Sequence, residues 1–222
     1  MVKRVNVYGC SQSAGVADFT ITYPNGMKHP GSWVFYLSQI HPNITFYNYA
    51  IPGTSLVWSC HNYDLLKHKA DKNIIQMAGP HRFTYHSIML DPYEIPLEQL
   101  SDNYYAFTDW PFWKKNFYSC THKKSDKPDW LNKYYEFKPE EHAMIECLAL
   151  MSHYGQQADF AFSHAKMFKH NYEFLKPKVP CILDSIDNDT YESYKCDKPG
   201  HFNEIGLKFM ANFVNSHINL AS

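Results

Sequence analysis

The sequence has no long apolar run, no excess of charge of one sign and no closely spaced pair of cysteines. Its 222 residues include 21 Lys and Arg and 22 Asp and Glu, a net charge of −1, which argues against a nucleic-acid binder that relies on a basic face. The longest apolar runs are well short of the roughly 20 residues that a membrane span requires. No apolar signal segment follows Met1. We therefore expect a cytoplasmic protein without a membrane span.

Cysteine and histidine spacing argues against disulfide and zinc frameworks. There is no CxxC pair, and scattered cysteines in a chain of this size predict reduced thiols. The 13 histidines form no HExxH motif, and no His/Cys spacing is typical of a zinc site. The six cysteines are Cys10, Cys60, Cys120, Cys147, Cys181 and Cys196.

Short β-rich segments alternate with helical patterns along much of the chain. The expected strands are Lys3–Gly9, Ile44–Ile51, Asn73–Ala78 and Pro180–Ile186, with a possible fifth in Tyr191–Cys196. Helices are expected after Ser32, over Ser55–Lys67, from Pro139, over Ala158–Leu175 and after Asn203. Such alternation predicts an α/β fold, a three-layer α/β/α sandwich with a mostly parallel central sheet.

Residues 83–138 carry many aromatic rings but no recognisable period. Aromatic residues make up 17% of the whole chain, which indicates a large hydrophobic core, an apolar binding surface, or both. A stretch this long and this rich in rings is more typical of an ordered insertion than of a linker. We expect one domain over residues 1–222, with this insertion over the site.

Polar residues follow the predicted strands where a site is expected. In open α/β sheets, ligands bind at the carboxyl ends of strands. Ser11 follows the first strand, Gly53 the second and Arg82 the third, and Asp197 and His201 follow the last ones. A serine hydrolase needs this set of nucleophile, oxyanion donors, base and orienting acid, although the GxSxG motif is absent.

Three blocks, in order, resemble the SGNH (GDSL-type) hydrolases. They read VYGCSQSAG, NYAIPGTSL and DKPGHFNEIGLKFMANFV, and the resemblance covers roughly residues 3–82 and 180–219. It implies a flavodoxin-like sheet with no metal or organic cofactor. It also implies that Ser11 is the nucleophile, His201 the general base and Asp197 the acid that orients it. The backbone N–H groups of Ser11 and Gly53 would be the oxyanion donors.

The chain departs from the family pattern at three points. Cys10 stands in place of the Asp of the G-D-S block, and four positions rather than three separate the acid from the histidine. The third block has no Asn for the third oxyanion donor, so we expect the side chain of Arg82 or Gln76 to supply an N–H group instead or to bind the substrate. Three further acids are alternatives to Asp197 as orienting group, namely Asp184, Asp187 and Asp189.

These observations predict a serine hydrolase that forms an acyl-enzyme on Ser11. Its partner would be a small-molecule or carbohydrate ester, such as an acetylated sugar. Two alternatives stay open: an acyltransferase with the same triad, and a catalytically silent binding protein on the same scaffold. Taken alone, without the other blocks, Ser11 is more typical of a turn after a strand, and His201 of a position before a helix, than of a catalytic group.

Overall fold

A six-stranded sheet forms the centre of the computed structural model, which describes residues 1–15, 19–77, 82–86, 95–109, 117–121, 140–163, 179–196 and 201–220. Neighbouring strands are parallel, except that β7 runs antiparallel to β8. The mostly parallel sheet is therefore confirmed. In spatial order its strands are β10 (Phe160–Ser163), β5 (Lys72–Met77), β1 (Arg4–Tyr8), β4 (Thr45–Asn48), β8 (Tyr104–Phe107) and β7 (Leu97–Ser101).

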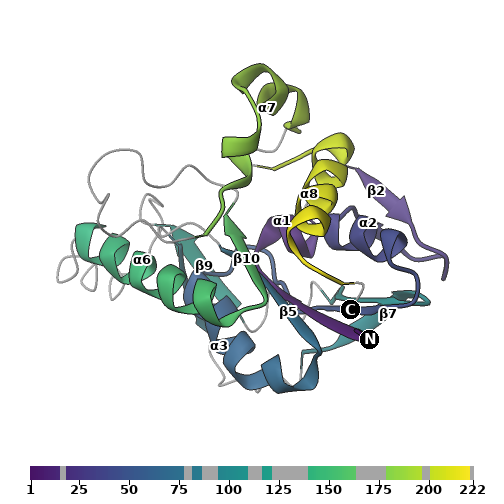
Figure 1. Cartoon of the computed structure of the whole chain (residues 1–222), viewed down its shortest axis with the longest axis horizontal. Coiled ribbons are helices and arrows are strands. Elements are labelled where there is room, and N and C mark those ends of the chain that lie inside the picture. Colours follow the sequence, from purple (N-terminus) through teal and green to yellow (C-terminus); the bar gives the residue numbers. More distant parts are fainter. Residues whose placement is uncertain are drawn as a thin grey trace.

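Helices cover both faces of this sheet (Figure 1). Helices α2 (Trp33–Ile40) and α8 (Glu204–His217) pack against one face, and α3 (Leu56–Leu66) and α6 (Glu140–Gln157) against the other. Side chains alternate along β1, so that Val5 and Val7 belong to the core beside α2 and α8, whereas Tyr8 belongs to the core beside α3 and α6. The three-layer α/β/α sandwich is confirmed.

Polar side chains begin three of the four covering helices at the expected positions. The Ser32 hydroxyl accepts a hydrogen bond from the Val34 N–H at 3.1 Å, and the Ser55 hydroxyl accepts one from Trp58 N–H at 3.4 Å. The Asn203 side chain accepts from the Gly206 N–H at 3.1 Å. Each cap satisfies a backbone donor that has no partner within its own helix.

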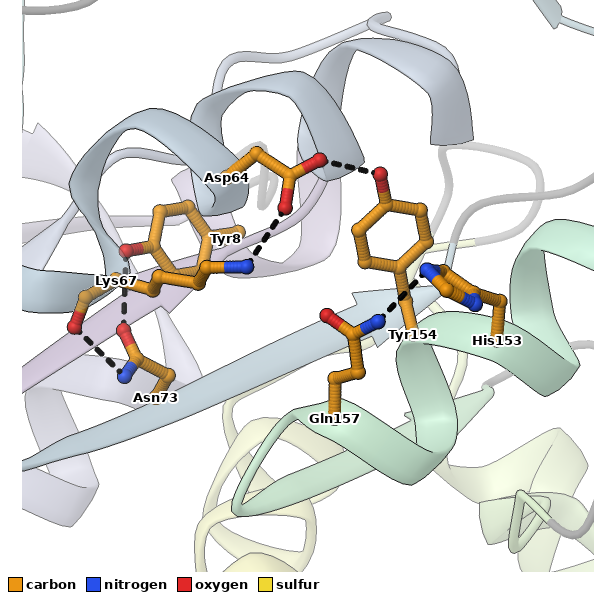
Figure 2. A network of polar contacts seen from close by, with 7 residues as sticks. All are labelled: Tyr8, Asp64, Lys67, Asn73, His153, Tyr154 and Gln157. Atoms are coloured by element: carbon orange, nitrogen blue, oxygen red, sulfur yellow. Dashed lines mark hydrogen bonds and ion pairs between the residues drawn. The ribbon is translucent and has the colours of Figure 1, made fainter.

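A polar network joins α3 to α6 and to the sheet beneath them (Figure 2). The Asp64 carboxylate accepts from the Tyr154 hydroxyl at 2.5 Å and from the Lys67 ammonium at 2.9 Å. The Lys67 carbonyl accepts from the Asn73 amide at 3.2 Å, and Asn73 accepts from the Tyr8 hydroxyl at 3.1 Å. In the same view, the Gln157 amide lies 2.7 Å from the ring of His153, one helical turn away.

Shorter elements complete the described part of the chain. Strands β2 and β3 pair antiparallel, as do β6 and β9. Their bounds are β2 Thr20–Thr22, β3 Lys28–Pro30, β6 Arg82–His86 and β9 Phe117–Thr121, and the short helices are α1 (Ser11–Ala14), η1 (Lys67–Lys69), η4 (Ile182–Ser185) and α7 (Asn188–Tyr194).

Three expected elements differ from the structure. The strand predicted over Pro180–Ile186 is wrong: the sheet contact is a single bridge from Cys181 to Ser163, and the 3-10 helix η4 follows. The fifth strand in Tyr191–Cys196 is also wrong, because α7 runs to Tyr194 and only Lys195 forms a bridge. The helix predicted from Ala158 is replaced by β10, and residues 164–175 lie outside the described residues.

The aromatic range 83–138 contributes two strands to the main sheet. Strand β8 pairs parallel with β4, and β7 then adds an antiparallel edge. Three of the six strands, β1, β4 and β5, were predicted from the sequence, whereas β7, β8 and β10 were not. The expected insertion thus includes part of the central layer, and its residues 87–94, 110–116 and 122–138 lie outside the described residues.

The structure also bears on membrane helices, cysteine thiols and metal sites. Across the described ranges, no helix is long and apolar enough to cross a membrane. The cysteines whose side chains the structure describes, Cys10, Cys60, Cys147, Cys181 and Cys196, have free thiols. No group of three or more His, Cys, Asp or Glu side chains suited to a metal ion occurs in the part of the chain that the structure describes.

Candidate active site

The first of the three blocks, VYGCSQSAG, follows β1, on either side of which the sheet is built outward in opposite directions. Strand β1 has β4 on one side and β5 on the other, and the chain reaches these neighbours through α2 and α3, which lie on opposite faces. In open α/β sheets, such a switch point is where ligands bind, at the carboxyl ends of the strands. The turn after β1 carries Ser11 as the first residue of α1.

Ser11 is nearly buried, with 5% of its surface exposed. Its hydroxyl donates to the Cys10 sulfur at 4.0 Å, a long and weak contact. Cys10 itself is 1% exposed and stands at the N-cap of α1 without a side-chain capping bond. A buried thiol therefore occupies the position at which the resembled family has a carboxylate.

Ser13, which the sequence reasoning did not select, forms the polar centre of this region. Its backbone N–H donates to Gln76 Oε1 at 3.1 Å, and its hydroxyl lies 2.5 Å from the same atom. The Trp33 indole N–H donates to the Ser13 hydroxyl at 2.9 Å. The Ser13 carbonyl accepts from the Ser32 hydroxyl at 2.6 Å and from the Asn48 amide at 2.5 Å.

The second block lies beside the first. The Thr54 hydroxyl donates to the Ile51 carbonyl at 2.7 Å and is 3.4 Å from the Gly9 carbonyl. Gly53, just before it, adopts a φ of 79° in the turn between β4 and α3. The contact from Thr54 to Gly9 links the Gly53 turn to the β1 turn that carries Ser11.

The last block also reaches the β1 turn. The Phe202 N–H donates to Gln12 Oε1 at 3.4 Å in a buried hydrogen bond, although the two residues are 190 positions apart. His201 precedes Phe202, and its carbonyl accepts from the Cys196 N–H at 3.1 Å. The ring nitrogen Nε2 of His201 is shielded from solvent. Among the described residues, no hydrogen bond joins the Ser11 hydroxyl to the His201 ring.

The remaining predicted residues occupy different places. Gln76 is completely buried at the end of β5, with Oε1 directed to Ser13. Arg82 begins β6, where its backbone pairs with Thr121, and its side chain lies outside the described part. Asp197, the first choice for the orienting acid, also lies outside the described residues.

The three alternative acids lie around α7. Asp184, Asp187 and Asp189 are all exposed. Asp187 caps α7, because its carboxylate accepts from the Thr190 N–H at 2.7 Å. This hydrogen bond lowers the pKa of Asp187. The capping role gives this acid a structural function of its own.

A cavity of about 330 Å³ lies on the α3 side of the sheet. The rings of its lining residues Tyr47 and Tyr105 are stacked, with centroids 4.8 Å apart and planes at 11°. Outside this lining, the Arg4 guanidinium lies 3.8 Å from the centre of the Tyr47 ring. The described residues that line it are Tyr47, Tyr49, Leu66, Lys69, Ile95, Leu97 and Tyr105.

Comparison with known proteins gives little further information. No family model matches the sequence, and no curated protein matches it. Among solved structures, the chain is similar to the lipase/acylhydrolase from Enterococcus faecalis, with 10% identity, 99% of each chain covered and a TM-score of 0.43. A likeness of this degree defines neither the activity nor the site residues of the present chain.

Proposed function

We propose that this protein is a serine hydrolase of the SGNH type that acts on small esters, including acetylated sugars, through an acyl-enzyme on Ser11. The observation that carries the proposal is the buried hydrogen bond from Phe202 N–H to Gln12 Oε1. It brings the histidine block next to the serine block, at the carboxyl end of β1. This arrangement is what the family resemblance requires of two blocks that are distant in sequence.

In the proposed mechanism, His201 removes the proton from the Ser11 hydroxyl as its oxygen attacks the ester carbonyl carbon. The C–O bond to the alcohol then breaks, and the protonated His201 returns the proton to the leaving alcohol. Water repeats these steps with the acyl-enzyme and releases the acid, which restores Ser11. Asp197 would hold the imidazole in one tautomer and stabilise its charged form.

The negative oxygen of each tetrahedral intermediate needs positioned donors. We assign two of them to the backbone N–H groups of Ser11 and Gly53, whose turns are linked by the contact from Thr54 to Gly9. For the third we favour Arg82 over Gln76. The acceptor oxygen of Gln76 is engaged with Ser13 in a fully buried position. A guanidinium offers five N–H donors and a fixed charge.

The test is hydrolysis of p-nitrophenyl acetate and longer esters by the wild type and by Ser11→Ala. We expect the variant to lose activity while it keeps its fold, because the nucleophile is removed without a change in packing. The matched control is Ser59→Ala, which alters another buried serine and should keep the wild-type rate. A Ser11→Ala enzyme with more than a tenth of the wild-type rate would exclude Ser11 as nucleophile.

The same assay distinguishes hydrolysis from acyl transfer. A hydrolase releases one acid for each alcohol at every acceptor concentration. An acyltransferase with the same triad would instead form an acylated sugar when a sugar acceptor is added, and the yield of free acid would fall. Quantifying both products with and without acceptor therefore assigns the fate of the acyl-enzyme.

Two observations favour a second candidate, a binding protein without catalysis. The Ser11 hydroxyl donates to Cys10 rather than to His201, and the tyrosine-lined cavity is of a size used for small ligands. A cavity lined by tyrosine side chains combines apolar ring surface with hydroxyl groups, which suits a sugar. Wild-type protein that hydrolyses none of the esters, yet binds a monosaccharide more tightly than Tyr105→Ala does, would favour this candidate.

A further inference from the structure

We infer that Ser13 is a positioning residue that holds the turn carrying Ser11 in place, with Gln76 and Trp33 as its anchors on two other elements. This inference rests on the proposed function, in which Ser11 is the nucleophile. Ser13 itself has no exposed surface and so cannot meet an ester. Its role is exerted through the turn that it shares with Ser11.

The helix that carries Ser11 is too short to define its own orientation. Helix α1 has four residues, and its internal backbone hydrogen bonds are Ala14 N–H to the Cys10 carbonyl at 2.9 Å and Gly15 N–H to the Ser11 carbonyl at 3.0 Å. An isolated turn of this length is unstable in water, because nucleation fixes several dihedral angles for very few hydrogen bonds. External contacts must therefore hold it in place.

Ser13 supplies those contacts with its backbone and its side chain together. Its N–H points to Gln76 on β5, and its carbonyl accepts from Ser32 at the start of α2 and from Asn48 on β4. Its hydroxyl lies between Gln76 and Trp33. One buried residue thus ties the turn to β5, β4 and the start of α2.

The direction of each hydrogen bond at Ser13 is fixed by chemistry. An indole N–H can only donate, so the Ser13 oxygen accepts from Trp33 and its proton is directed to Gln76 Oε1. The carboxamide of Gln76 then receives two donors on its oxygen. Rotating this amide by 180° would place its NH₂ group against the Ser13 backbone N–H, which can only donate, so the network allows one orientation.

The turn is also closely packed against the same anchor. A Cβ atom at Gly9 would lie 2.7 Å from the Ser13 hydroxyl and 3.0 Å from the Gln76 Cβ. Only glycine fits at position 9, because the hydrogen-bonded Ser13 and Gln76 side chains pack directly against it. The turn is therefore held by close packing at Gly9, two residues before Ser11, and by hydrogen bonds at Ser13, two residues after it.

Removing the hydroxyl should lower the rate of chemistry more than the affinity for substrate. For Ser13→Ala we expect kcat on p-nitrophenyl acetate to fall about tenfold to a hundredfold, with KM within about twofold of wild type, because misplacing a reacting group by about 1 Å has effects of this order. The rate at which a fluorophosphonate labels Ser11 should fall in parallel. The control is Ser38→Ala, which removes another buried serine hydroxyl, in α2, that donates to Phe35 at 2.8 Å.

Variants of the two anchors separate positioning from a general loss of stability. Gln76→Glu keeps an acceptor for Ser13 and should retain more of kcat than Gln76→Met, which has none. Trp33→Phe removes the indole donor and provides a second variant if Ser13→Ala does not fold. Equal kcat values for Gln76→Glu and Gln76→Met would overturn the inference.

Hydrogen exchange of residues 9–15 gives a readout that does not depend on activity. Ser13→Ala should exchange faster in this segment than wild type, and Ser38→Ala should not. Unchanged exchange, or Ser13→Ala with more than half of the wild-type kcat, refutes the positioning role. If Ser11→Ala remains active, the proposed function fails instead, and faster exchange would then still show that Ser13 anchors the turn.

Discussion

Replacing Gly15 with alanine should destabilise the protein by more than the same change at Gly26. Both glycines have positive φ, 85° and 81°, a region that costs an L-residue roughly 1–2 kcal/mol. Their surroundings differ. A Cβ at Gly26 would have no atom within 4 Å, whereas one at Gly15 would lie 2.7 Å from the Pro30 carbonyl oxygen and 3.0 Å from that of Gly31. The pair therefore separates backbone conformation from steric overlap.

The two free energies follow from these contacts. At Gly26, the conformational cost is partly offset by the lower entropy of the unfolded alanine chain, roughly 0.4–1 kcal/mol, which leaves a loss of about 1 kcal/mol or less. At Gly15, the overlap involves backbone oxygens that cannot rotate away. Overpacking of this kind typically adds roughly 1–3 kcal/mol. We expect a total loss of about 2–4 kcal/mol at Gly15.

Thermal unfolding followed by circular dichroism measures the difference. In a chain of this size, 1 kcal/mol corresponds to a shift in Tm of about 2–4 °C. Gly26→Ala should therefore lower Tm by at most about 4 °C, and Gly15→Ala by roughly 5–15 °C. Equal melting temperatures for the two variants would refute the argument, because the predicted overlap would then have no energetic consequence.

Three further predictions concern regions outside the candidate site. Burial raises the pKa of Asp64, but hydrogen bonds from Tyr154 and Lys67 outweigh it, so that the pKa lies below its ordinary value. Tyr154→Phe should therefore lower the stability at pH 7 by roughly 1 kcal/mol or less, and the difference in Tm between the variant and the wild type should shrink as the pH falls through this lowered pKa and the carboxylate is protonated; a difference that grows on acidification would contradict this. Burial raises the pKa of Cys147 to about 12 and also that of Cys60, so both should react with a disulfide reagent only after unfolding, and rapid reaction in the native state would contradict this. Phe162→Ala should cost roughly 3–5 kcal/mol in urea unfolding, since its ring is fully buried between α2 and α8.

Local chemistry made much of the fold predictable from the sequence. The helices that begin after Ser32, Ser55 and Asn203 have a capping side chain followed by apolar residues at helical spacing. The strands β1, β4 and β5 contain β-branched and aromatic residues and end at turn signals. These features act within a few residues of each other, so the sequence alone reveals them.

Elements defined by distant partners could not be predicted in this way. Strand β10 has four buried residues, and a short apolar run of this kind has no period that distinguishes a strand from a helix. Ile182 and Leu183 are typical of a strand, but only Cys181 forms a bridge and the next residues turn into η4. Strand β8 pairs with β4, a segment more than 50 residues earlier in the chain. The local sequence of β8 does not reveal this distant partner.

The sequence directed attention to the three blocks, whose role as a site stays a prediction, but not to the contacts that support them. The chemistry expected of a nucleophile directs attention to Ser11, whereas Ser13 has the denser network of hydrogen bonds. Its partners Trp33, Asn48 and Gln76 come from three separate segments. In the sequence, the one sign of this supporting role is the spacing Gly9, Ser11 and Ser13, in which a second serine follows the first by two positions.

The hydrogen bond between Gln12 and Phe202 has a consequence for the time at which the site can form. On a ribosome that adds about 5–20 residues per second, the second partner is synthesised roughly 10–40 s after the first. Until Phe202 is synthesised, the turn after β1 lacks its contact with the histidine block, even if the sheet has already folded. Under the proposed function, nascent chains arrested before residue 201 should therefore be inactive even if the sheet is formed, and the onset of ester hydrolysis would mark the arrival of this last segment.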